Sequence, residues 1–500
     1  MNLLPQKYAE HIQGVLSCYD RVIIQGTLHP FCYPEGMTGF LKARNIRIFD
    51  YPKWACNLRD SLIKNTEQLA KDNNLKIDYI RKSNLRKEDI IKSILKFRGD
   101  KPGLVHIFSA LESCPSYKPW HDKTTHQTFL KYNSGKCLHY YFYFIDEILG
   151  LCYVRVPTYA PFRLQIYFNG HNLLTFQLKK AGIKFNIIDN AFINIDDFEK
   201  AQNMASSIKI ERLHRIFDKF ANLYCPIIKK FALKYRWSIM QAEYATDIIF
   251  SERASLSKIY DPLIRTATHS VKPENIATFL GKKLHGNFAG EMGNNLQTRI
   301  LGSRIKHVMG KNSIKMYDKF GTILRIETSS NDVSSFQHYR KVEKRDGKIA
   351  YKIARMKKGI YSLEPLRKIL LSSNYRYLEF ISAIEDNHAG IENLRRISER
   401  ITEKDHTYRG FNFFDNKDEK IFLSVSKGEF NIYGFKNKDL RNFLNKEMGQ
   451  ISRILKRLRI YGLIKKAPSS YKYYLTELGK KVILTGLKLK ELYIIPALSC

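Results

Sequence analysis

Apolar and polar residues alternate along the first 130 residues in a way that predicts strands separated by helices. Helical periodicity fits residues 53–74 and 85–99. Four short runs between and around these helices are expected to be strands: RVIIQGTL (21–28), IRIFDY (46–51), LKIDYI (75–80) and GLVHIFSA (103–110). This spacing predicts an α/β domain with a partly parallel sheet over residues 1–130, in which the polar stretch 113–128 is a connection.

Residues 131–340 are predicted to form a β-rich and helical central domain. LHYYFYF (138–144) and FRLQIYF (162–168) both alternate strongly. Tyr141, Tyr143 and Arg163 would then share exposed sheet faces on which nucleic-acid bases can stack. The alternative is that helices cover both faces, which would make these tyrosines ordinary core aromatics.

Two acidic residues suggest a metal site in the middle of the chain. Residues from about 207 to 250 are expected to be mainly helical, with a break at Pro226. Glu243 and Asp247 are four residues apart and would lie on one helix face, where two carboxylates could bind a divalent cation. The alternative is that they are solvated or pair with a neighbouring Lys or Arg.

The segment IKMYDKFGTILRIETSSND (314–332) predicts a hairpin with a polar face. A three-residue loop at 319–321 would place residue 316 opposite residue 324. The apolar residues then share one face, and the other face collects Lys315, Tyr317, Arg325 and Glu327. Lys315 and Arg325 could bracket an anion there, or the face is solvated and carries an ordinary ion pair.

The segment before the hairpin is rich in glycine and polar residues. KLHGNFAGEMGNN (283–295) contains Glu291, and Arg304 and Lys306 follow it closely. Glycine at this density predicts an irregular loop whose backbone can approach a ligand. We expect this loop and the polar hairpin face to line one groove that contacts nucleic acid.

After the hairpin, residues 341–420 are predicted to form a basic hairpin and a helical connector, and residues 421–500 a winged helix-turn-helix. Over 427–490, Lys and Arg number 16 against four acidic residues. In a winged helix the second helix enters the DNA major groove, and the wing contacts the backbone or the minor groove. The expected DNA contacts are Arg453, Lys456, Arg457, Arg459 and Lys472.

The overall charge points to a polyanionic partner. Lys plus Arg outnumber Asp plus Glu by 84 to 48, a net charge of +36. This favours DNA or RNA first and an anionic membrane surface second. Because no apolar run reaches the ~18 residues of a spanning helix and no signal-peptide pattern is present, we expect a cytoplasmic protein. The eight cysteines contain no CxxC pair, which argues against a zinc ribbon and for reduced thiols.

The tail GEFNIYGFKNKDLRNFL…ISRILKRLRIYGLIKKAPSSYKYYLTELGKK resembles that of large bacterial proteins usually named MarR-like transcriptional regulators. The resemblance extends along nearly the whole chain, including YDRVIIQGTL, QAEYATDIIF and IKMYDKFGTILRIET. True MarR regulators are short helical dimers, so that name rests on the tail alone and leaves most of the chain unexplained.

A second, local resemblance concerns the polar hairpin. KMYDKFGTILRIE is similar to a strand pair of plasmid and phage replication initiators, and the matching positions are Tyr317, Lys319, Arg325 and Glu327. The His-hydrophobic-His pair of one major nickase class is absent, which argues against that class.

These observations leave three functions open. The first is a DNA-processing protein of a mobile element, resembling a replication initiator or transposase. It would use Tyr317 as a nucleophile, or a metal ion held by some of Glu243, Asp247, Glu291 and Glu327. The second is a non-catalytic DNA-binding regulator, and the third is a protein that binds structured RNA. The sequence predicts a nucleic-acid-binding α/β and α+β multidomain protein without deciding whether it is an enzyme.

Overall fold

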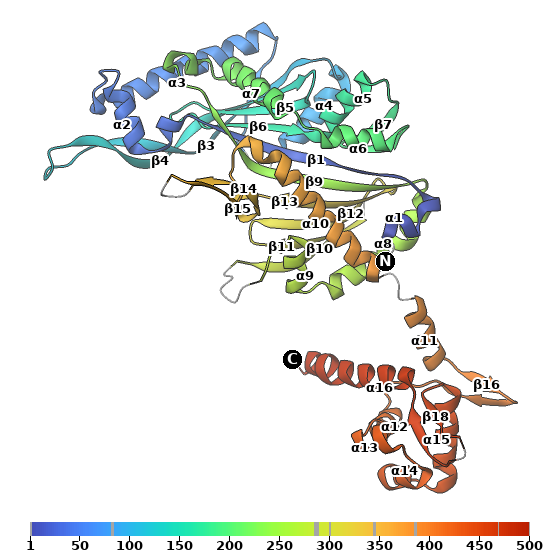
Figure 1. Cartoon of the computed structure of the whole chain (residues 1–500). Coiled ribbons are helices and arrows are strands. Elements are labelled where there is room, and N and C mark those ends of the chain that lie inside the picture. The colour runs from blue at the N-terminus through green and yellow to red at the C-terminus, as the bar shows by residue number, and fades with distance from the viewer. Residues whose placement is uncertain are drawn as a thin grey trace. The chain divides into compact units, whose positions relative to one another are not determined.

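The computed structural model describes residues 3–81, 85–284, 290–299, 302–343, 347–384, 388–468 and 470–499 (Figure 1). The chain divides into two compact units, Met1–Ile384 and Glu385–Cys500. The boundaries predicted at residues 130 and 340 both fall inside the first unit, because one sheet takes strands from both sides of residue 130.

The first unit is built on a mixed sheet of eleven strands in the order β10-β11-β12-β13-β9-β1-β6-β5-β4-β3-β2. Within the described part of the chain, β2 and β3 are the parallel neighbours and the other neighbouring strands are antiparallel. The strands are β1 (Ile12–Thr27), β2 (Ile77–Tyr79), β3 (Gly103–His121), β4 (Thr128–Asp146), β5 (Gly150–Pro157), β6 (Leu164–Asn169), β9 (Arg236–Phe250), β10 (Met292–Arg299), β11 (Gly302–Met309), β12 (Asn312–Lys319) and β13 (Ile323–Ser330).

The strand order is symmetric about the pair formed by β1 and β9. On one side, β3 to β6 form an antiparallel meander whose last strand pairs with β1. On the other side, β10 to β13 form a second meander whose last strand pairs with β9. Apart from the short edge strand β2, each half therefore consists of β1 or β9 and a four-stranded meander, and β1 and β9 meet at the centre.

One face of this sheet is apolar and is covered by helices. In the first half, Ile24, Phe142 and Ile166 belong to a core that includes residues of α2 (Pro34–Lys42), α3 (Tyr51–Asp72) and α7 (Ile210–Tyr224). In the second half, Ile248 and Ile326 pack with residues of α8 (Arg253–Ser270), α9 (Pro273–Phe279) and α10 (Leu363–Ile384). Figure 1 shows α10 lying across β9 and β13.

The opposite face carries the polar side chains and is covered only in part. Helix α4 (Lys87–Arg98) packs on aromatic residues of β3, β4 and β5. Helices α5 (Gly170–Lys180) and α6 (Phe198–Ser206), with the hairpin β7–β8 (Phe185–Ile188 and Ala191–Ile195), cover Leu16 and Cys18 of β1. The candidate site lies on this polar face.

Several predicted elements differ from the structure. Residues 46–51 are not a strand, because a 3-10 helix at Ile48–Asp50 leads directly into α3. The predicted polar connection 113–128 is mostly strand: β3 runs to His121 and pairs with β4 from Thr128 onward. Cys114 and Tyr117 of this arm are buried but Ser113, Lys118 and His121 are exposed, so its sequence lacks the regular apolar alternation that marks a strand.

The largest difference concerns residues 207–250. Helix α7 ends at Tyr224 before Pro226, as predicted, but residues 236–250 form strand β9 and not a helix. This strand lies near the centre of the sheet, and its last residues are buried on both faces. Its sequence therefore lacks the apolar–polar alternation of a half-exposed strand.

The second unit is helical with two small hairpins. Helices α14 (Asn437–Leu444) and α15 (Met448–Ile460) are followed by β18 (Ile464–Lys466), β19 (Tyr473–Leu475) and α16 (Glu477–Leu489). Leu440, Ile451, Leu455 and Leu458 belong to its apolar core. Among the helices of the described ranges, none combines the length and the apolar character needed to cross a membrane.

Candidate metal centre

The polar hairpin has the predicted faces, with a register that differs by two residues. Lys319 pairs with Ile323 across the loop Phe320-Gly321-Thr322, so Met316 lies opposite Ile326 and not opposite Leu324. Gly321 has a φ of +77°, a conformation that suits glycine. Side chains alternate with a period of two along a strand, so a two-residue shift leaves every side chain on its predicted face.

Strand β9 adds two carboxylates to this polar face. Glu243 pairs in register with Ser329, and Asp247 pairs with Arg325. The two acidic residues were expected on one face of a helix. Residues four apart also share one face of a strand, so they still lie on the same side of the structure.

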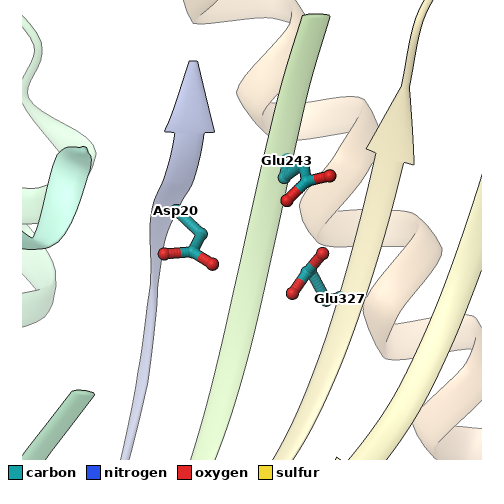
Figure 2. A group of neighbouring side chains, drawn as sticks. All are labelled: Asp20, Glu243 and Glu327. Atoms are coloured by element: carbon teal, nitrogen blue, oxygen red, sulfur yellow. The ribbon is translucent and has the colours of Figure 1, made fainter. Parts of the chain in front are cut away.

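A β-bulge brings a third carboxylate from β1. The register between β1 and β9 shifts between Tyr19 and Val22, so that Asp20 and Arg21 together lie opposite Glu243. Bulges re-aim side chains and are common beside functional sites. One carboxylate oxygen from each of Asp20, Glu243 and Glu327 lies within 4.8 Å of the other two, and Figure 2 shows the three side chains converging from three neighbouring strands.

Each carboxylate of this trio has polar partners. Glu327 forms an ion pair with Lys315, whose Nζ lies 2.6 Å from Oε1, and it accepts a hydrogen bond of 2.7 Å from the Tyr317 hydroxyl. The Lys315 ammonium is also 3.5 Å from Glu243 Oε1. Asp20 accepts hydrogen bonds from the side-chain amides of Asn169 and Asn190.

The three carboxylates of the trio lie close together, so a negative charge on one disfavours ionisation of its neighbour. Burial, followed by the neighbouring charge on Glu327, raises the pKa of Glu243 to about 7. Burial would also raise the pKa of Glu327, but the Lys315 ammonium holds it below its usual value. A single lysine therefore stabilises the charge on one glutamate and leaves the other weakly compensated.

Arg325 and Asp247 form a buried ion pair beside the trio. Arg325 is 0% exposed, and its Nε and Nη2 lie 2.6 Å from Oδ1 and Oδ2 of Asp247. Burial would raise the pKa of Asp247, but Arg325 lowers it to about 2. Nη1 of Arg325 also lies 3.4 Å from Asp20. Contrary to expectation, Arg325 does not face solvent, and it holds Asp20 and Asp247 in position.

Of the other residues predicted around the hairpin, some lie on its polar face and one lies near the sheet edge. Tyr317 points to Glu327, and burial raises its pKa well above that of a free phenol, which disfavours a tyrosinate nucleophile. On β11, Arg304 lies opposite Tyr317 and Lys306 lies opposite Lys315, so both cations share the polar face. Glu291 is exposed and precedes the edge strand β10, which lies three strands from β13, about 14 Å. Residues 285–289 of the glycine-rich loop lie outside the described residues.

The predicted stacking platform is wrong. Tyr141 is 8% and Tyr143 3% exposed, and both pack with Ile91 of α4. The Tyr141 hydroxyl donates a hydrogen bond of 2.6 Å to Glu112. These tyrosines are core aromatics, the alternative considered from the sequence, because α4 covers their face of the sheet. Arg163 is half-buried and lines a small cavity on the same face.

The basic residues of the second unit divide into exposed and structural ones. Arg453, Lys456 and Arg459 are exposed on α15, and Lys472 is half-buried next to β19. Arg457 is different: its guanidinium lies 2.8 Å from the buried Asp418 and donates to the carbonyl oxygens of residues 409 and 410. Its predicted exposure on α15 is therefore wrong, because it ties α15 to a neighbouring segment.

Asp20 is not among the residues predicted from the sequence, although it lies in YDRVIIQGTL, one of the segments that resemble the proteins named MarR-like regulators. The usable signal was an acidic residue inside an otherwise apolar strand. Comparison with protein-family models, with curated proteins and with solved structures found no match to this chain, so the resemblances to MarR-like regulators and to replication initiators stay predictions.

Proposed function

We propose that this protein is an enzyme that uses a divalent metal ion to break or transfer phosphodiester bonds in nucleic acid. The observation that carries this proposal is the convergence of Asp20, Glu243 and Glu327 from three central strands. Mg²⁺ and Mn²⁺ prefer carboxylate oxygens. A bound dication would stabilise both glutamates in their charged forms, which Lys315 alone does not.

The metal would supply charge stabilisation and an activated water to a phosphoryl centre. The chain's own residues position the ligands. Arg325 orients Asp20, the bulge aims Asp20 at Glu243, and the Tyr317 hydroxyl orients Glu327. Lys315 lies within the cluster, where its ammonium can stabilise negative charge on a phosphoryl oxygen.

The cations on the neighbouring strand support a phosphate-bearing substrate. Lys306 lies directly across from Lys315 in the register of β11 and β12. Lys315 is paired with Glu327, so Lys306 is the cation of this pair that can contact a phosphate. With the net charge of +36, the anion that fits best is the backbone of nucleic acid.

The second unit supports DNA as the ligand. Its order of helix, helix, two-stranded hairpin and helix matches the order expected for the proposed winged helix-turn-helix. Arg453, Lys456 and Arg459 are exposed on the second helix, where such a domain contacts the major groove. The proposed protein therefore docks on duplex DNA through this unit and acts through the carboxylate trio.

The test is cleavage of labelled single-stranded DNA, duplex DNA and RNA by the full chain with Mg²⁺, with Mn²⁺ and with EDTA. Asp20→Asn, Glu243→Gln and Glu327→Gln are each expected to abolish metal-dependent cleavage and to keep DNA binding in EDTA. Glu274→Gln, at an exposed position on α9, is the matched control and keeps activity. Undiminished cleavage by the Glu243 and Glu327 variants would refute the proposal.

A second candidate function is a non-catalytic DNA-binding regulator. The observation that favours it is the 2.6 Å ion pair between Lys315 and Glu327, which already compensates one carboxylate of the trio. In that case the full chain binds duplex DNA equally well with and without metal, and no substrate is cleaved.

A further inference from the structure

The strands β14 (Gln337–Glu343) and β15 (Ile349–Arg355) form a two-stranded ribbon that is separate from the main sheet. Figure 1 shows it beside the main sheet of the first unit. Its base is fixed, because the Met356 amide donates a hydrogen bond of 2.9 Å to the Phe336 carbonyl and both side chains are buried. A two-stranded ribbon alone has little stability in water, so a ligand bound to its exposed face would stabilise it.

One face of the ribbon exposes large apolar side chains. Tyr339 lies opposite Ile353, and Tyr351 lies opposite Lys341. Tyr339 is 68%, Tyr351 63% and Ile353 69% exposed. The two tyrosine rings are stacked across the strands, with centroids 5.9 Å apart and planes inclined by 28°. Adjacent exposed aromatic rings of this kind mark an interaction surface.

The ribbon is also strongly basic. Its described residues 337–343 and 347–358 contain seven Lys or Arg and a single acidic residue, Glu343. Lys341 and Arg355 are exposed on the same face as the two tyrosines. A surface that combines flat aromatic rings with cations complements a polyanion that carries flat apolar groups, which describes nucleic acid.

We propose that the Tyr339–Tyr351 face is a stacking platform for unpaired bases of single-stranded nucleic acid, with Lys341 and Arg355 contacting the phosphates. Exposed aromatic rings stack on base faces without regard to sequence. In a duplex those base faces are covered by neighbouring base pairs, so the platform selects single strands. The ligand class rests on the proposed function, whereas the site lies outside the carboxylate trio.

The experiment measures affinity of the full chain for a fluorescein-labelled oligothymidylate and for a duplex of equal length by anisotropy, in EDTA. Tyr339→Ala and Tyr351→Ala are each expected to weaken single-strand binding roughly 5- to 150-fold, as loss of a stacked base does. Tyr339→Phe and Tyr351→Phe keep the rings and keep wild-type affinity. Tyr361→Ala is the matched control, since Tyr361 is 60% exposed in the same unit and lies off the ribbon.

Three outcomes would overturn the platform: alanine variants with wild-type single-strand affinity, phenylalanine variants as weak as the alanine variants, or an equal loss of duplex affinity. Melting temperatures of all variants show whether the unit remains folded. Because binding is measured without metal, a failed cleavage experiment leaves this test intact, and weakened single-strand binding without any cleavage would separate the two proposals.

Discussion

Replacing Glu243 with glutamine should stabilise the first unit in the absence of metal, although it removes a proposed metal ligand. Burial and the charge on Glu327 raise the pKa of Glu243 from an ordinary 4.5 to about 7. One pKa unit corresponds to about 1.4 kcal/mol, so the ionised carboxylate costs about 3 kcal/mol of folding free energy above pH 7. Its side chain is 14% exposed, so solvent screens little of this cost.

Proton binding to Glu243 determines how the free energy of unfolding changes with pH. The folded protein holds the Glu243 proton more tightly than the unfolded chain, so stability is lost as the pH rises from about 4.5 through about 7. Glutamine has no proton to lose. At pH 8 in EDTA, Glu243→Gln should therefore unfold with a free energy up to about 3 kcal/mol above wild type, and at pH 5 the two proteins should differ little.

Glu327 provides the matched contrast on the neighbouring strand. Burial opposes its ionisation, but the Lys315 ammonium and the Tyr317 hydroxyl stabilise the charged form. Glu327→Gln removes the closer charged partner of Lys315 and should destabilise the unit at both pH values, less at pH 8, where the ionised Glu243 carboxylate 3.5 Å away can pair with Lys315. Two isosteric substitutions in one cluster are thus expected to change the free energy of unfolding in opposite directions at pH 8 in EDTA.

The assay is urea unfolding of both variants, wild type and Glu274→Gln at pH 5 and pH 8, in EDTA and with excess MnCl₂. Metal at 100 times its dissociation constant stabilises the wild type by about 2.7 kcal/mol, and the Glu243 and Glu327 variants should lose most of this gain. The reasoning is refuted if Glu243→Gln is less stable than wild type at pH 8 in EDTA, or if Mn²⁺ stabilises all four proteins equally.

Three further predictions concern buried and exposed basic residues. Arg325→Met removes the guanidinium that pairs with the buried Asp247 and should cost about 3–5 kcal/mol in urea unfolding. A loss below about 1 kcal/mol would contradict the geometry. Removing Arg453 and Lys456 together by alanine substitution should lower the salt dependence of duplex DNA binding by about 0.9 in log–log slope for each lost phosphate contact. Arg457→Ala should instead lower the melting temperature of the second unit, and an unchanged melting temperature would argue against its structural role.

The polar hairpin shows what sequence alone can predict. The predicted pairing of residue 316 with residue 324 was wrong, yet Lys315, Tyr317 and Glu327 lie together as expected. Side-chain direction depends only on whether positions are odd or even along a strand, so an error of two residues does not change it. The same reasoning explains why Glu243 and Asp247 share a face although the predicted helix is a strand.

Asp20 and the tyrosine strand show what sequence patterns cannot supply. Asp20 meets Glu243 and Glu327 through a bulge, and pairings so distant along the chain leave no local periodicity. The alternation around Tyr141 and Tyr143 correctly separates two faces of β4, but it does not say whether one or both are covered. That depends on α4, a helix more than 40 residues earlier whose packing direction has no local signature.

The central position of β1 has a consequence for how the chain folds as it is synthesised. This strand is made first, yet Arg21 pairs with Asn169 and Cys18 with Ala245. At about 5–20 residues per second, a ribosome needs roughly 11 to 45 s to go from Cys18 to Ala245. During this interval the edge of VLSCYDRVIIQGTL that will pair with β9 has no partner and can pair with a wrong strand. A nascent-chain chaperone that covers this stretch until β9 emerges would therefore govern the yield of correctly assembled protein.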